Sequence, residues 1–178
     1  MTETTNNKLS RAITNSSHVK YLTFKIAIQE FGVNILRVKE IISMIDITPI
    51  PQTPQFVKGI INLRGQIIPV VDLRMKLGYT EIEYDDRSCI IVVEIESEKS
   101  KTLMSIVVDY ISEVISMMEE NISSPPDFGG TYNADYIEGI AKLDEKVVIL
   151  LNIQKIFAGE EIIRVMQTIN NNEEGEQG

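Results

Sequence analysis

Two segments of this chain repeat each other, and this internal repeat constrains the fold more than any other feature. GIINLRGQIIPVVDLRMKLG begins at Gly59, and GIAKLDEKVVILLNIQKIFAG begins 80 positions later at Gly139. A second pair lies upstream at an offset of 73, where EIISM from Glu40 is matched by EVISM from Glu113. The two copies have the same order of parts. In each, the segment beginning at Glu40 or Glu113 is followed by a proline-containing loop and then by the segment beginning with Gly-Ile. The sequence therefore predicts a duplicated structural unit.

The duplication predicts two similar small β-barrels placed side by side, lobe one over about 19–85 and lobe two over about 86–160. Each lobe alone buries too little apolar surface to be comfortably stable, so we expect the two to share an apolar seam. A seam between two convex barrels also leaves a groove. We expect a rod-like partner to lie in that groove.

Alternating apolar residues predict mainly β-structure. Runs of this kind predict a hairpin and further strands. The hairpin pairs 21–28 with 32–38 around a turn at 29–31, and the other strands are 67–73, 89–95, 105–111 and 147–153. Short helices are expected at 72–79 and 152–159, each ended by glycine, and an amphipathic helix at 160–169. Proline-rich loops at 48–54 and 123–130 do not fit central strands.

The two ends of the chain are polar. Residues 1–18 form a leader and residues 161–178 combine the C-terminal helix with an acidic tail, and we expect the leader and the stretch from Asn170 to be flexible. The domain proper is expected over 19–160. The chain has no apolar signal segment and no run of about 20 apolar residues, so the sequence predicts a cytoplasmic protein without membrane insertion.

The net charge of -9 argues against nucleic acid and anionic membranes as partners. The chain has one histidine, His18, and one cysteine, Cys89, which leaves no Cys–His nucleophile pair and no His/Cys metal site. Glu40, Asp72, Asp109 and Glu113 could support acid–base chemistry, although charges at strand ends are usually structural. Asp72 and its counterpart Asn152 can each cap a short helix. We therefore predict no catalytic residues, metal or cofactor, and keep a carboxylate-based enzyme or sensor as an alternative.

The tips of the two repeats differ. The first copy has Asn62-Leu63-Arg64-Gly65, where the second has Lys142-Leu143-Asp144-Glu145. Gly65 allows a turn with positive φ, which leaves Arg64 projecting from a rigid hairpin. An exposed arginine on a turn is usually only solvated, but arginine is also enriched at the anchors of protein interfaces. Arg64 is the strongest candidate for a partner contact.

Four longer phrases carry a resemblance to a known family: FGVNILRVKEI, TPIPQTPQFVKGIINLRGQIIPVVDLR, SIVVDYISEVI and YIEGIAKLDEKVVILLNIQKIF. Over about 20–158 the chain resembles the CheW family of bacterial chemotaxis coupling proteins. The resemblance implies two five-stranded SH3-like barrels packed on a shared hydrophobic core, without enzymatic activity. It also implies an adaptor that joins methyl-accepting chemotaxis receptors to the regulatory domain of the histidine kinase CheA, in arrays at the inner membrane face.

The resemblance also implies site residues. Those expected at the receptor are Arg64, Gly59, Ile35, Val38, Glu40, Val107 and Val108. Those expected at the kinase are Ile41, Ile42 and Phe56. Taken by themselves, the aliphatic residues on strands are more often core than contact surface. A related coupling protein for a chemosensory pathway other than motility is an alternative that these residues do not separate from the first.

Overall fold

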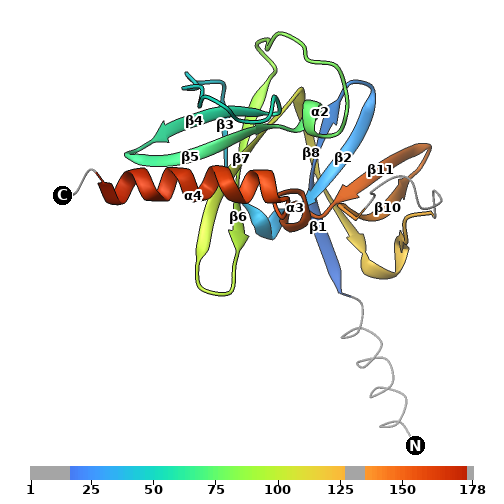
Figure 1. The fold of residues 1–178 in the computed structure, drawn as a ribbon. Helices are drawn as coiled ribbons and strands as arrows, with labels where there is room; N and C mark the ends of the chain where they lie inside the picture. Colours follow the sequence, from blue (N-terminus) through green and yellow to red (C-terminus); the bar gives the residue numbers. More distant parts are fainter. Residues whose placement is uncertain (1–16, 127–134, 176–178) are drawn as a thin grey trace, which may run out of the picture.

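Two β-sheets make up most of the molecule (Figure 1), and the computed structural model describes residues 17–126 and 135–175. The five-stranded sheet has the strand order β3 (Val38–Ser43), β6 (Cys89–Glu96), β7 (Lys101–Val108), β5 (Gln66–Asp72) and β4 (Val57–Leu63). The six-stranded sheet has the order β8 (Tyr110–Met118), β1 (His18–Ile26), β2 (Gln29–Asn34), β11 (Lys146–Leu151), β10 (Ile137–Leu143) and β9 (Ile122–Ser123). The chain is therefore mainly β, as predicted.

The chain does not build one sheet after the other. The strands of the five-stranded sheet run continuously from β3 to β7, whereas the six-stranded sheet combines β1 and β2 with the strands that follow β7. The boundary expected near residue 85 consequently does not separate the sheets. The physical reason is that β3 leaves the first hairpin and pairs with β6, while β1 pairs with β8. The six-stranded sheet also has one strand more than expected, the two-residue β9.

The duplication predicted from the sequence is visible in the strand pairing. The β4–β5 and β10–β11 hairpins have the same register, with Gly59 opposite Val70 and Gly139 opposite Leu150. Each hairpin is extended by a parallel pair, β5 with β7 and β11 with β2. Parallel neighbours in two otherwise antiparallel sheets are a specific feature. Their occurrence at equivalent positions supports one structural unit used twice.

Alternation along the central strands sends side chains to two different cores. On β6, Ile91 and Val93 pack in the core shared between the sheets, whereas Ile90 and Val92 pack inside the five-stranded sheet. The six-stranded sheet has its own small core around Tyr21 and Leu150. Strands buried on both faces read as continuous apolar runs. This explains the sequence CIIVV and confirms the shared hydrophobic core.

Three helices and two single turns complete the described structure. Their bounds are η1 (Ile35–Arg37), α2 (Leu73–Lys76), η2 (Glu119–Asn121), α3 (Ile153–Ile156) and α4 (Glu160–Gly175). Asp72 caps α2 by accepting a hydrogen bond from Met75 N, and Asn152 caps α3 by accepting one from Lys155 N, as predicted. Among the described residues, no helix is both long and apolar enough to cross a membrane.

Helix α4 lies alongside the five-stranded sheet (Figure 1), with Ile162, Val165 and Ile169 buried in the shared core. The helix was expected to end at Ile169, but it continues to Gly175, so the flexible tail expected from Asn170 is wrong over that stretch. The physical reason is that no glycine or proline interrupts the sequence before Gly175, so the helix can propagate past its last anchored turn. The last three residues and most of the leader lie outside the described residues.

Three local predictions need correction. The β1–β2 turn lies at Ala27–Ile28 rather than 29–31, and Ala27 has a φ of 54°. Asp109 accepts the Ala27 N–H at 2.6 Å, which stabilises that turn through a side chain distant in sequence. Asp109 also interrupts the strand expected at 105–111, so that β7 ends at Val108 and β8 begins at Tyr110. Of the proline-rich loop expected at 123–130, residues 127–130 lie outside the described residues, and Ser123 ends strand β9.

Candidate functional site

The tip of the β4–β5 hairpin is a tight turn built by its own sequence. Arg64 and Gly65 both have positive φ, 51° and 85°. The Asn62 side chain accepts a hydrogen bond from Gly65 N at 2.9 Å, which fixes the turn from within. A two-residue turn with positive φ at both positions matches the twist of the flanking strands. The predicted role of Gly65 is confirmed, and Arg64 is held on a rigid support.

Arg64 forms a two-pronged ion pair with Glu40. Its Nη1 donates to Glu40 Oε1 at 3.0 Å, and its Nη2 donates to Oε2. This pairing lowers the pKa of the Glu40 carboxyl, chiefly through the hydrogen bond from Arg64, and raises the pKa of the guanidinium. The Arg64 side chain nevertheless remains 71% exposed. The ion pair therefore orients an accessible guanidinium while contributing little to stability.

The ion pair joins the two edges of the five-stranded sheet, because Glu40 lies on β3 and Arg64 follows β4. Next to it is an open depression of about 590 Å³. Charged residues on three strands line it, with Lys39 Nζ 3.2 Å and Lys101 Nζ 3.5 Å from the Glu94 carboxylate. Hydrogen bonding from Lys39 lowers the pKa of Glu94. This surface is suited to recognising polar and charged groups on a protein partner.

Sequence reasoning missed Glu94 and Lys101. Both belong to this surface only because β3, β6 and β7 are neighbours in the sheet. The alternation of Lys39, Glu94 and Lys101 across three strands is a favourable cross-strand pattern. It could be found from the sequence only once the β3–β6 pairing is known.

The apolar groove expected between the lobes is filled by the molecule's own side chains. Val107 and Val108 were expected to contact the receptor, but they are 2% and 1% exposed; Val107 packs inside the five-stranded sheet and Val108 in the core shared between the sheets. Ile35 and Val38 are partly buried against the shared core. A partner cannot reach Val107 or Val108 without unfolding the sheet, so those two predictions are wrong as contact residues.

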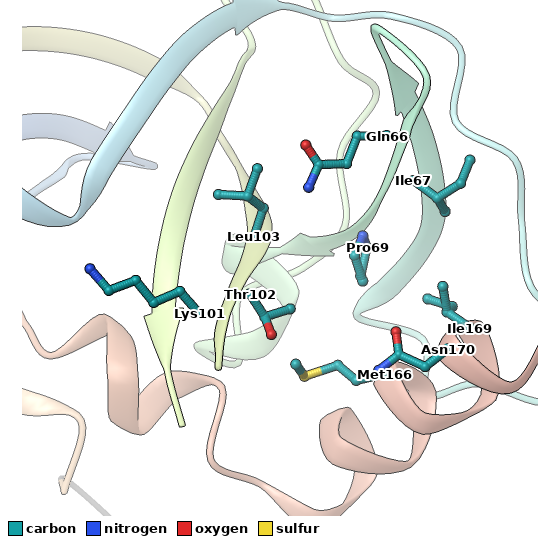
Figure 2. A pocket seen from close by; sticks show the side chains of 9 residues that line it. All are labelled: Gln66, Ile67, Pro69, Lys101, Thr102, Leu103, Met166, Ile169 and Asn170. Atoms are coloured by element: carbon teal, nitrogen blue, oxygen red, sulfur yellow. The ribbon is translucent and has the colours of Figure 1, made fainter. Parts of the chain in front are cut away.

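Helix α4 covers part of the core that the two sheets share. Figure 2 shows Met166, Ile169 and Asn170 of α4 facing residues of β5 and β7 across a small hollow. The hollow measures about 160 Å³, too small for a helical partner. A helix-in-groove mode therefore does not apply at the seam itself.

Gly59 has a structural explanation. Its φ is 138°, and a Cβ built on it would lie 1.9 Å from the carbonyl oxygen of Thr48. Thr48 at that point exchanges backbone hydrogen bonds with Ile60, both at 2.9 Å. The glycine allows two backbone segments to meet. Any effect of Gly59 on a partner must act through the backbone, because the residue is buried.

The three residues expected at the kinase are not equally accessible. Ile41 is 43% exposed on the outer face of β3. Ile42 packs against the core of the five-stranded sheet, and Phe56 packs against the shared core with Lys76 Nζ 4.5 Å above its ring. Of the three, Ile41 offers a partner the most surface.

Three of the four carboxylates considered for acid–base chemistry, Glu40, Asp72 and Asp109, make structural contacts. Asp72 is buried, caps α2 and accepts a hydrogen bond from the Tyr84 hydroxyl at 2.8 Å. Asp109 pairs with Arg74 at 2.6 Å and holds the β1–β2 turn. Glu40 pairs with Arg64. Within residues 17–126 and 135–175, no three His, Cys, Asp or Glu side chains are placed to hold a metal ion.

Known proteins similar to this chain share both its sequence and its fold. The family model for the CheW-like domain matches residues 20–161. The chain is 36% identical over 146 residues to the chemotaxis protein CheW of Klebsiella aerogenes, covering 82% of this chain and 86% of that protein. It is 34% identical over 150 residues to chemotaxis protein CheW of Treponema pallidum, with 83% and 87% covered. Among solved structures, the scaffolding protein TtCheW from Thermoanaerobacter tengcongensis matches with a TM-score of 0.72 and 37% identity, over 82% of this chain and 96% of that one.

Proposed function

This chain belongs to the CheW-like domain family, and from that premise we propose that it is an adaptor coupling chemoreceptor tips to the histidine kinase CheA. The observation that carries the proposal is the Arg64–Glu40 pair, an accessible guanidinium fixed at the tip of a rigid hairpin. Of the carboxylates considered for catalysis, Asp72 caps a helix, Asp109 holds a turn and Glu40 pairs with Arg64. These structural roles favour a chain that acts by binding.

The receptor surface is centred on Arg64 and Glu40. A guanidinium has five N–H groups, and the two prongs to Glu40 leave others free to donate to carbonyl or carboxylate groups of a receptor helix. Glu40 therefore presets the direction of Arg64, which lowers the entropy lost when a partner binds. The depression lined by Lys39, Glu94 and Lys101 supplies complementary charges around this centre.

Ile35 and Val38 form the partly buried flank of the receptor surface, and Gly59 keeps the β4 backbone close to Thr48. Binding thus takes place over the open end of the five-stranded sheet, with modest apolar burial and a large share of charged contacts. Interfaces of this composition are specific and sensitive to ionic strength.

The kinase surface is centred on Ile41, on the outer face of β3. Ile42, the next residue on β3, packs against the core of the five-stranded sheet, and Phe56 packs against the shared core just before β4, so both contribute less exposed surface than Ile41. Edge strands offer unpaired backbone groups to another sheet, and β3 is an edge of the five-stranded sheet. One strand therefore presents Glu40 toward the receptor and Ile41 toward the kinase, and the adaptor is recruited to arrays at the inner membrane face by these contacts.

Reconstitution tests this function directly. The full chain is mixed with the kinase and a membrane-anchored receptor fragment, and kinase autophosphorylation is measured with each component omitted in turn. We expect a more than tenfold increase that requires all three components, because coupling depends on a bridge. Equal kinase rates with and without the chain, in the absence of any complex, would contradict the adaptor function. Turnover of a small molecule by the chain alone would favour the enzyme alternative.

A further inference from the structure

Strands β5 and β7 are neighbours in the five-stranded sheet, but their first halves do not pair. The parallel ladder begins with Val70 opposite Ser105, so the residues that precede these two have no partner in the other strand. Pro69 explains the missing pairs, because a proline has no N–H to donate to a neighbouring strand. The Pro69 carbonyl accepts a hydrogen bond from Ser105 Oγ instead, at 2.8 Å. Backbone pairing between β5 and β7 therefore stops at Pro69.

The second copy of the unit is paired at the matched positions. The β11–β2 ladder begins with Val148 opposite Glu30, and Val148 matches Ile68, which precedes the first paired residue of β5. Ile149, which has an N–H, stands where the first copy has Pro69. The loss of pairing is thus specific to the five-stranded sheet and is not a requirement of the duplicated fold.

A small hollow lies where this pairing is missing, between β5, β7 and helix α4 (Figure 2). It measures about 160 Å³, which suits a single side chain. Gln66, Lys101 and Leu103 line this hollow and also line the depression beside Arg64, so the two are continuous. A partner that contacts Arg64 can therefore place one of its side chains in the hollow.

The polar groups of the hollow can all donate hydrogen bonds. They are the amides of Gln66 and Asn170, the hydroxyl of Thr102 and the ammonium of Lys101. Amide and hydroxyl groups can also accept, so the sign of the ligand is set by Lys101. Among the described residues, Lys101 is the only lining residue with a formal charge, and no acidic side chain lines the hollow. These groups together favour an anionic ligand.

Lys101 can turn to a ligand because its present partners have closer ones. Its Nζ is directed away from α4 (Figure 2) and lies 3.5 Å from the Glu94 carboxylate and 3.9 Å from the Glu96 carboxylate. Glu94 lies closer to Lys39, at 3.2 Å, and Glu96 lies closer to Arg37, at 3.4 Å. The Lys101 side chain is 65% exposed, so its flexible stem can rotate without repacking. Neither glutamate loses its nearest cation when Lys101 moves.

We propose that the hollow holds the carboxylate of an Asp or Glu side chain of the protein partner that contacts Arg64, an inference that rests on the proposed function. Lys101 supplies the opposite charge, and Gln66, Thr102 and Asn170 supply neutral donors. A phosphate group fits less well, because one lysine does not balance its charge of nearly two. The receptor surface thereby extends from the tip of the β4–β5 hairpin to helix α4.

The first experiment uses acetate as the probe and does not depend on the proposed function. The side-chain amides of Gln66 and Asn170 are followed by NMR in the full chain, up to about 100 mM sodium acetate against sodium chloride at equal ionic strength, a range that detects millimolar dissociation constants. We expect both amides to shift saturably with acetate only. Lys101→Met should weaken acetate binding about fivefold. Lys99→Met, on the same hairpin but outside the hollow, should not.

Three results of the acetate titration would overturn the site. They are the absence of a saturable shift, the same shift with sodium chloride, and equal responses of Lys101→Met and Lys99→Met. The last result would mean that acetate senses only the net charge of the chain, which the two variants change by the same amount.

The second experiment tests the contact with the partner. Binding of the receptor fragment is measured by titration calorimetry for the wild-type chain, Lys101→Glu and Lys99→Glu at two salt concentrations. We expect Lys101→Glu to weaken binding about tenfold at low salt and less at high salt, with Lys99→Glu close to wild type. Among receptor variants in which single Asp or Glu residues of the tip are replaced by Lys, one should bind Lys101→Glu more tightly than it binds the wild-type chain.

The outcomes separate the contact from the function. Equal binding by Lys101→Glu and Lys99→Glu would overturn the carboxylate contact and leave the adaptor function standing. If the wild-type chain binds no receptor fragment, the proposed function fails and the partner contact fails with it, whereas the acetate titration still decides whether the hollow holds a carboxylate.

Discussion

The β4–β5 and β10–β11 hairpins have the same fold and register but different tips. The first places Arg64 and Gly65 in its turn, and the second places Asp144 and Glu145 there. Arg64 and Asp144 have nearly the same φ, 51° and 53°, so the backbone accepts either residue. At the tips the residues that differ face solvent, although Ile61 and its match Ala141 also differ inside the cores. The charge of the tip can therefore differ between the copies without a change in the supporting backbone.

Substitution of the two matched glycines by alanine should give the largest difference in stability between the two copies. Gly59→Ala should destabilise the chain by about 4 kcal/mol, because a Cβ meets the Thr48 backbone and the residue has strained φ. Gly139→Ala should cost less, about 2 kcal/mol, because a Cβ would lie 2.5 Å from the Ile122 Cγ2 methyl and 3.1 Å from the Ser123 carbonyl oxygen but without a positive φ. Urea denaturation of both variants measures the difference. Equal costs would show that the Thr48 contact is not rigid.

Removal of the two helix caps should lower the free energy of unfolding by amounts that differ less than those for the glycines. Asp72→Ala removes the cap of α2 and also leaves the Tyr84 hydroxyl without its acceptor, at a cost of about 2–3 kcal/mol. Asn152→Ala removes only the cap of α3 and should cost about 1 kcal/mol. The control is Asp72→Asn, whose single carbonyl oxygen can keep the cap of α2 while its NH2 group replaces the oxygen that accepts from the Tyr84 hydroxyl, so it separates the two contributions. Thermal or urea unfolding decides the order, and a greater loss for Asn152→Ala would contradict it.

Exchanging the tip residues tests whether the tips alone separate the roles of the copies. Arg64→Asp should weaken receptor binding about tenfold, equivalent to about 1.4 kcal/mol. The stability should hardly change, because Asp144 already occupies the matched turn. Asp144→Arg is the reciprocal control and should bind the receptor as wild type does. The affinity of a receptor fragment is measured by titration calorimetry, and equal losses in the two variants would show that the tips are not distinct.

The repeat, most strand positions and the two helix caps could be predicted, because each depends on residues close in sequence. The filling of the groove could not be predicted. Val107 and Val108 are apolar on consecutive positions, and only the sheet order shows that one faces each core. The surface around Glu94 and Lys101 was missed for the same reason, since β3 pairs with β6 across the intervening β4–β5 hairpin. Arg64 was identified because its turn is local.

Substitutions at the second central residue of the two hairpin turns should change stability less than those at the matched glycines. Gly65→Ala should cost about 1 kcal/mol, because φ is 85° and a Cβ there meets no atom within 4 Å, so only backbone strain remains. Glu145→Ala in the other hairpin should be close to neutral, since Glu145 is exposed and not in the positive-φ region. Urea midpoints of the two variants provide the comparison, and a neutral Gly65→Ala would mean that the first turn relaxes.

The smallest effect concerns the pH dependence of Glu40. Its pKa is lowered in the folded chain by the hydrogen bond from Arg64. A lowered carboxyl pKa contributes stability above the unfolded pKa, and this contribution is lost as the pH falls through the folded pKa. Because the pair is exposed, we expect the change in the pKa to be easier to detect than the change in stability. NMR titration of the Glu40 carboxyl should show a higher pKa in Arg64→Asp, where a carboxylate replaces the guanidinium. An unchanged pKa would mean that the ion pair does not persist in solution and that Arg64 is not oriented by Glu40.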